Sequence, residues 1–239
     1  GLSIIAGTKT SNDPIFNLPK DGAAKLNVLA CSIIADKADS VEDTVFMIAG
    51  NSEVRVEKSY VHTTSCFSRF KDGSTAEKPL YILDSNIVGE PYEVGSADTR
   101  KVNFLSGWTA PLDNPVVVEN SYLQYYYRLW DGQKAGVNFV NSTVRHTGYS
   151  NSNTGSDMNL SRYAPITFDE TSRLMWPNKG GMTFDNSGKN GSVLVKEGFR
   201  VNSNRFFTND GYSSYVFPDG LTQKTSTQYQ FIYDPYGDT

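Results

Sequence analysis

Side chains able to do nucleophilic or acid–base chemistry are scarce in this sequence. The 239-residue chain has two histidines, His62 and His146, and two cysteines, Cys31 and Cys66. His62 and Cys66 are four positions apart, which on one strand separates them by roughly 13 Å. That separation argues against a Cys–His nucleophile pair, and we interpret His146 as a solvated histidine at a strand end.

Carboxylates are the remaining candidates for catalysis. A glycosidase needs two of them at a set distance, and four lie near aromatic residues: Glu119, Asp131, Asp169 and Glu170. Each also suits an ordinary strand end or turn. No phosphate loop, G-x-S-x-G elbow, zinc motif or metal-type cysteine spacing occurs. We therefore expect no catalytic residue, no metal and no cofactor.

The segment "SYLQYYYRLWDG", residues 121–132, concentrates aromatic side chains. Read as one strand ending in an Asp131-Gly132 turn, it has two faces because alternate side chains point to opposite sides. We expect the buried face to carry Leu123, Tyr125, Tyr127 and Leu129. The outer face then carries Tyr122, Gln124, Tyr126, Arg128 and Trp130, with Arg128 able to stack between Tyr126 and Trp130.

Three partners suit this outer face: another part of the same chain, a neighbouring subunit, or a sugar whose C–H face stacks on flat rings. The C-terminal segment repeats the pattern, and we predict that it also binds or forms an interface through Tyr229, Phe231, Tyr233 and Tyr236. The polar stretch 146–162 is expected to be an exposed loop, represented by Tyr149, Asn151, Asn153 and Asp157.

The elements that would position these residues are β-strands. Aromatic residues make up 13 % of the chain and hydrophobic residues 38 %, and the Tyr, Phe, Val and Ile content suits pleated sheets. Short alternating runs separated by Asn-Gly and Asp-Gly turns predict an all-β fold with few or no helices: an antiparallel β-sandwich, jelly roll or barrel. We expect a single domain over residues 1–239, with a weak alternative boundary at 109–115, and see no repeat period.

Charge and hydropathy restrict the partners. The net charge of −4 argues against a general nucleic-acid binder. Residues 1–120 carry 11 basic and 16 acidic groups, and residues 121–239 carry 11 basic and 10 acidic ones. No run approaches membrane-spanning length, and the start "GLSIIAG" does not read as a signal peptide. Cys31 and Cys66 can be read as a disulfide or as two buried thiols.

Residues 22–56, "GAAKLNVLACSIIADKADSVEDTVFMIAGNSEVRV", resemble a strand pair from the jelly rolls of picornavirus-like coat proteins. In that family a G-x-L-x-V strand and a V-x-x-x-V-F-x-x-x-G strand flank a short polar insert. A mature start at glycine is also typical of such coats. Here the pair comes first rather than last, so no functional residue is carried over. The resemblance implies a structural or surface protein of an unenveloped virus.

These observations lead to three hypotheses. The first is a non-enzymatic virion capsid or spike-like surface protein that assembles with copies of itself or sister coat proteins, and that binds a host receptor or glycan. The second is a secreted or cell-surface carbohydrate-binding module or adhesin. The third is a β-sandwich glycoside hydrolase. The first two place the protein on a virion surface or outside the cell.

Overall fold

The computed structural model describes the chain in segments. They are residues 2–6, 14–35, 44–91, 102–126, 129–147, 158–159, 166–169, 171–175, 182–184, 192–195, 200–202, 206–209, 214–216 and 228–230. In several strands only the backbone is described, among them every strand from Met182 onward. The described residues form 25 strands and no helix. None of them belongs to a helix long and apolar enough to cross a membrane.

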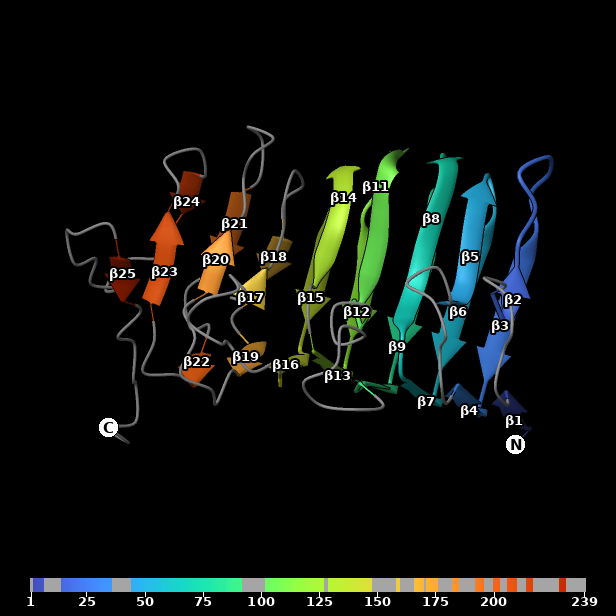
Figure 1. Ribbon diagram of the computed structural model, residues 1–239, viewed down its shortest axis with the longest axis horizontal. Helices are drawn as coiled ribbons and strands as arrows, with labels where there is room; N and C mark the ends of the chain where they lie inside the picture. Colours follow the sequence, from blue (N-terminus) through green and yellow to red (C-terminus); the bar gives the residue numbers. More distant parts are fainter. Residues whose placement is uncertain are drawn as a thin grey trace.

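Three sheets run side by side along the length of the molecule, with β1 and β25 near opposite ends (Figure 1). The first sheet contains β1 (Ser3–Ala6), β4 (Ser32–Ala35), β7 (Tyr60–Thr63), β10 (Asn86–Gly89), β13 (Tyr122–Tyr125), β16 (Thr143–His146), β19 (Arg173–Met175) and β22 (Arg200–Asn202). The second contains β2 (Phe16–Asn17), β5 (Thr44–Gly50), β8 (Cys66–Ser74), β11 (Leu105–Leu112) and β14 (Trp130–Lys134).

The third sheet contains β3 (Lys25–Leu29), β6 (Glu53–Glu57), β9 (Leu80–Leu83), β12 (Val116–Glu119), β15 (Val137–Val140), β18 (Ile166–Phe168), β21 (Ser192–Val195) and β24 (Ser214–Val216). A fourth, smaller sheet contains β17 (Met158–Asn159), β20 (Met182–Phe184), β23 (Phe206–Asn209) and β25 (Gln228–Gln230). The pairs of the first three sheets are parallel, while β23 and β25 pair antiparallel.

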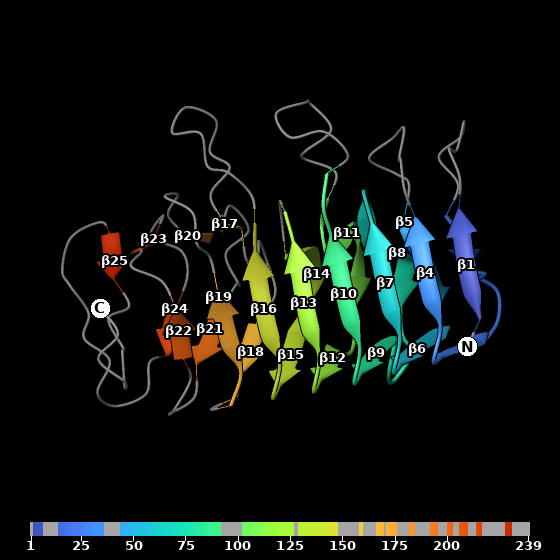
Figure 2. The ribbon, with the colours of Figure 1, turned by 90° about the horizontal axis from the view of Figure 1, so that it is seen from below.

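The chain winds as a three-sided solenoid. It passes from a strand of the third sheet to one of the first and then one of the second, and each strand pairs with its equivalent in the next coil. Successive coils therefore advance by one strand spacing, about 4.8 Å. In Figure 2 the strands of the first sheet lie in front, in chain order.

The core is built from inward rows that run across the coils. In the first sheet, Ile33, Val61, Ile87, Leu123, Val144 and Leu174 are aligned by the strand register and are at most 1 % exposed. Aromatic rings extend these rows, with Phe139 stacked on Phe168 at 4.9 Å between ring centroids. Because strand side chains alternate, each inward row leaves an outward row on the opposite face.

A serine ladder forms the corner between the third and first sheets. The N–H of Ser59 donates to Oγ of Ser85 at 3.1 Å, and the N–H of Ser85 donates to Oγ of Ser121 at 3.0 Å. Four of the ladder hydroxyls also donate to the carbonyl two residues earlier, as Ser85 does to Leu83 at 2.8 Å. The Ser172 hydroxyl donates instead to the carboxylate of Asp169. Equivalent bonds join Cys31 to Ser59, Ser121 to Ser142 and Ser142 to Ser172.

The residue before each of the first five ladder positions turns the corner. Ala30, Lys58, Asp84, Asn120 and Asn141 have φ values between 45° and 51°. This left-handed conformation is unfavourable for residues with a Cβ, and aspartate and asparagine tolerate it best. Their N–H groups bond to the next coil, as Lys58 N–H does to the Leu83 carbonyl at 3.0 Å, and this holds the bend.

The expected antiparallel sandwich, jelly roll or barrel is wrong. The all-β character is confirmed, but strands that are neighbours in sequence lie in different sheets and pair in parallel with the next coil. The sequence shows no repeat period, although the coils repeat in space. Ladder partners are 28, 26, 36, 21 and 30 residues apart, and this variable spacing hides the repeat.

One local prediction is corrected as well. The run 121–132 is not one strand: β12 ends at Glu119, β13 spans Tyr122–Tyr125, and Asp131 and Gly132 lie within β14 rather than in a turn. The described part of the segment that resembles coat proteins, residues 22–35 and 44–56, contains β3, β4, β5 and β6, which lie in three sheets.

Candidate functional site

A shallow groove of about 720 Å³ follows the serine-ladder corner across successive coils. One wall consists of the corner residues Ala30, Lys58, Asp84 and Asn120, which are all exposed. Because these four residues belong to consecutive coils, the groove runs parallel to the solenoid axis over roughly 14 Å. We call this feature the corner groove.

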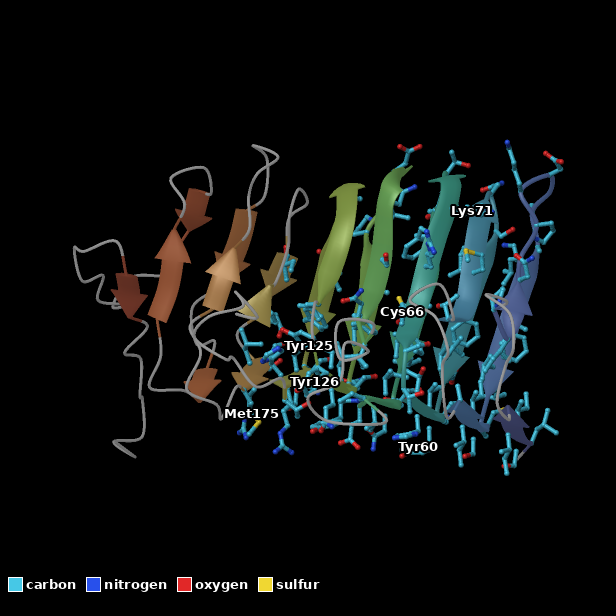
Figure 3. The ribbon with its side chains drawn as sticks, in the orientation of Figure 1. Tyr60, Cys66, Lys71, Tyr125, Tyr126 and Met175 are labelled. Carbon is cyan, nitrogen blue, oxygen red and sulfur yellow. The ribbon has the colours of Figure 1, made fainter. Side chains whose placement is uncertain are left out.

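The opposite wall carries an outward row of the first sheet. Tyr60 on β7, Asn86 on β10 and Tyr122 on β13 are direct register partners and all line the groove. Tyr60 is 38 % exposed, and Figure 3 shows it on the outer side of the ribbon. The two tyrosines are therefore about two strand spacings apart, roughly 10 Å, with an amide between them.

The floor of the groove does not offer its hydroxyls to a ligand. Ser59 and Ser85 are buried, and each hydroxyl both accepts a ladder N–H and donates to a carbonyl. Their role is to hold the corner residues and the tyrosines at fixed positions. The residues that can contact a ligand are therefore those of the two walls.

A network of polar side chains outside the groove holds Tyr122 in place. Its hydroxyl donates to Oε1 of Gln124 at 2.9 Å, and Nε2 of Gln124 donates to the Glu90 carboxylate. The other oxygen of Glu90 lies 3.9 Å from Nε2 of His62. Because the Tyr122 proton is directed at Gln124, its phenolic oxygen presents an acceptor to the groove.

Charge in the corner groove is balanced. Lys58 lies 3.8 Å from the carboxylate of Glu57 through Nζ, and Asp84 supplies an acidic group in the next coil. Asn120 accepts a hydrogen bond from Nδ2 of Asn141 at 2.8 Å. Two aromatic faces with interspersed amides and balanced charge suit a hydroxyl-rich, extended ligand.

On the outer face of the third sheet, one tyrosine, Tyr81, lies among charged side chains. The guanidinium of Arg55 lies 5.1 Å and Nζ of Lys78 5.6 Å from the Tyr81 ring centroid. The Tyr81 hydroxyl donates to Glu119 at 2.5 Å. Partial burial, followed by this hydrogen bond, raises the pKa of Tyr81 to about 12. Since Tyr81 is already covered by cations, its ring is not open for stacking.

The structure separates His62 from Cys66, the two residues considered from the sequence as a nucleophile pair. His62 faces outward on β7, whereas Cys66 begins β8 in another sheet and is 1 % exposed. Neither Cys31 nor Cys66 forms a disulfide. His146 is buried beside Tyr125, with ring centroids 5.0 Å apart, and burial raises the pKa of Tyr125 well above its usual value.

Two of the four candidate carboxylates make structural contacts. Glu119 binds Tyr81, while Asp169 accepts hydrogen bonds from Thr171, from Ser172 and from the N–H of Asn141. Asp131 lies in β14, and Glu170 is outside the described residues. Among the described side chains, no group of three histidines, cysteines or carboxylates is arranged to hold a metal ion.

Burial confirms part of the two-face prediction. Leu123, Tyr125 and Leu129 are fully buried, and Tyr122 and Tyr126 are half-buried. Gln124, which was expected on the outer face, is only 7 % exposed. Tyr127 and Arg128 lie outside the described residues.

Most other predicted site residues are not placed by the structure. Trp130 begins β14 and Tyr229 is central in β25, but only their backbone is described. The remaining aromatic and loop residues lie outside the described part of the chain: Phe231, Tyr233, Tyr236, Tyr149, Asn151, Asn153 and Asp157. Their assignment to binding, to an interface or to an exposed loop stays a prediction.

Tyr60 and Asn86 were not predicted from the sequence as site residues, although a local signal marks them. The tripeptides Lys58-Ser59-Tyr60, Asp84-Ser85-Asn86 and Asn120-Ser121-Tyr122 share a corner residue, a ladder serine and an outward side chain. Aligning them on the serine places the third residues in one row.

Comparison of this chain with protein-family models, curated proteins and solved structures gives no match.

Proposed function

We propose that this protein is a non-enzymatic recognition protein that binds an extended glycan along the corner groove. The observation that carries the proposal is the row Tyr60–Asn86–Tyr122, which places one aromatic ring on each side of an amide. The strand spacing of about 4.8 Å is close to the length of one pyranose unit in an extended chain. A sugar polymer lying along the axis therefore meets one side chain per unit.

The setting we propose is an outer surface, either of a virus particle or of a cell. The long, regular solenoid (Figure 1) suits a projecting, spike-like element that presents one face to a host glycan. The earlier resemblance to coat proteins of unenveloped viruses motivates the virion alternative. Localising the chain in its native source by immuno-electron microscopy separates the two settings, and a uniformly intracellular signal would exclude both.

A glycan array followed by calorimetry on the positive oligosaccharides tests the binding proposal. We expect Tyr60→Ala and Tyr122→Ala each to weaken binding at least about 10-fold, equivalent to about 1.4 kcal/mol. Tyr81→Ala is the matched control, because Tyr81 lies on the third sheet outside the groove. Binding that survives both groove substitutions, with the fold intact by circular dichroism, would reject the groove.

Self-assembly is a second candidate function, favoured by the first described coil. Leu2, Ile5 and Leu29 are 62 %, 72 % and 57 % exposed, and strands β1 and β3 stand last in their sheets. Exposed apolar side chains at a sheet edge favour association with another chain. We expect oligomers in light scattering that Ile5→Glu and Leu29→Glu disrupt. A wild-type monomer at high concentration would contradict this role.

A further inference from the structure

The outward row that lines the corner groove continues beyond Tyr122. Its next register partners are Thr143 on β16 and Arg173 on β19. Arg145 lies two residues after Thr143 and so faces the same side of the sheet. Arg173 is exposed and Arg145 half-exposed. The outward face therefore changes from aromatic and amide side chains to arginines, with Arg173 in the row itself and Arg145 in the adjacent row.

The two arginines have no acidic partner among the described residues. Neither guanidinium takes part in an ion pair or a hydrogen bond within the described part of the chain. The neighbouring carboxylate, Asp169, is committed to Thr171, Ser172 and Asn141. Arginine is the side chain best suited to bind carboxylate and sulfate groups through paired N–H donors.

The geometry places these arginines within reach of a ligand in the groove. Arg145 and Arg173 are diagonal neighbours on adjacent strands, roughly 8 Å apart at Cα. Arg173 lies two strands beyond Tyr122, roughly 10 Å along the axis. Figure 3 shows Met175, the register partner of Arg145, on the same outer side as Tyr60.

The sign of the charged side chains also changes along the groove. Asp84 and Glu90 lie on the coil that precedes Tyr122, and the arginines lie on the coils that follow it. Because Lys58 offsets the acidic groups in the first part of the groove, an acidic ligand group is favoured only at the end of the row, beside the arginines. The same asymmetry appears in the whole sequence, where residues 121–239 are richer in basic than in acidic groups.

We propose that Arg145 and Arg173 form an anion subsite at the end of the corner groove, and that the ligand is an acidic glycan. This inference rests on the proposed glycan-binding function and narrows its ligand class to sugars with carboxylate or sulfate groups. The acidic group lies one or two sugar units beyond the ring stacked on Tyr122. The ligand thereby binds in one orientation.

The test compares three oligosaccharides of one backbone: a neutral form, a form with uronate groups and a sulfated form. We expect the full-length protein to bind an acidic form about 10-fold more tightly than the neutral one. The uronate and sulfated arms identify which acid is recognised. The preference should shrink as salt is raised, because exposed charges are screened.

Variants separate this subsite from the groove itself. Arg145→Gln and Arg173→Gln should remove the preference for the acidic form and leave the affinity for the neutral form unchanged. Arg55→Gln, on the third sheet, is the matched control. Since neither arginine has a partner among the described residues, both variants should keep the wild-type Tm.

The outcomes are distinguishable. Equal affinity for the neutral and acidic forms would contradict the anion subsite but would still agree with glycan binding in the corner groove. Binding of neither form would overturn both proposals. A single-stranded oligonucleotide that binds as tightly as the acidic glycan, and depends on the same arginines, would replace the acidic glycan as ligand.

Discussion

The Oγ of Ser85 accepts a hydrogen bond from the N–H of Ser59 at 3.1 Å, although the two residues are 26 positions apart in sequence. The same hydroxyl donates to the Leu83 carbonyl at 2.8 Å. One small side chain thus satisfies groups from two successive coils. The corner groove depends on this bond because Tyr60 and Asn86 directly follow the two serines.

Removing the Ser85 hydroxyl should destabilise the solenoid. Ser85→Ala leaves the buried N–H of Ser59 and the Leu83 carbonyl without this partner, which costs about 1–3 kcal/mol. Chemical denaturation at equilibrium measures the change. Ser3→Ala, at an exposed position of β1, should change stability by less than about 0.5 kcal/mol. Equal effects of the two substitutions would show that the ladder bond contributes nothing.

Glycine should have opposite effects at two alanines of the first described coil. Ala30 has φ 51°, so Ala30→Gly relieves about 1–2 kcal/mol of strain, partly offset by about 0.4–1 kcal/mol of added unfolded-state entropy. Ala24 is not among the positive-φ residues, so Ala24→Gly should destabilise by about 0.4–1 kcal/mol. Thermal unfolding of both variants checks the sign, and a loss of stability in Ala30→Gly would contradict the corner geometry.

Asp169 should make the protein sensitive to acid. Burial alone would raise its pKa, but hydrogen bonds from Ser172, Asn141 and Thr171 outweigh burial and lower the pKa below 3.8. A lowered folded-state pKa contributes stability that is fully present above 3.8 and is lost as pH falls through the folded value. Denaturation midpoints measured from pH 6 downward, to about pH 2, should fall less steeply in Asp169→Asn.

The two cysteines should react at different rates in the native protein. Cys31 is half-buried and lines the corner groove, whereas Cys66 is 1 % exposed. A maleimide should therefore modify Cys31 first and Cys66 only after unfolding, as mass spectrometry of peptides can show. If the groove binds glycan, a bulky label on Cys31 should also weaken that binding, and Cys31→Ser should restore it in labelled samples.

Local strand positions were largely predictable, whereas their pairing was not. Residues 44–50 are a continuous run of β-formers, and they form β5. Residues 53–62 can also be read as one run of β-formers, but the structure divides them into β6 and the start of β7, with a bend at Lys58, whose φ is 48°. A lysine gives no signal for this conformation, since glycine and asparagine are the residues expected there.

No local pattern in the sequence indicated that the strands pair in parallel. Alternating side chains look the same in an antiparallel sandwich and in a solenoid, because both bury one face of each strand. The repeat was visible only at the serines, where the spacing varies from 21 to 36 residues. Tyr122 could be proposed from its aromatic neighbours, but Tyr60 becomes part of the site only through the register with Asn86.

The 21-residue step from Ser121 to Ser142 is the shortest coil of the ladder, and the longer steps reach the same register. The longer coils therefore hold their extra residues without changing the distance along the solenoid axis from one coil to the next. Nearest-neighbour solenoids of this kind tolerate the addition or removal of whole repeats. If the corner groove binds a glycan, lengthening the protein by one coil would extend the groove by about one sugar unit, and the number of coils would then set the length of polymer that is bound.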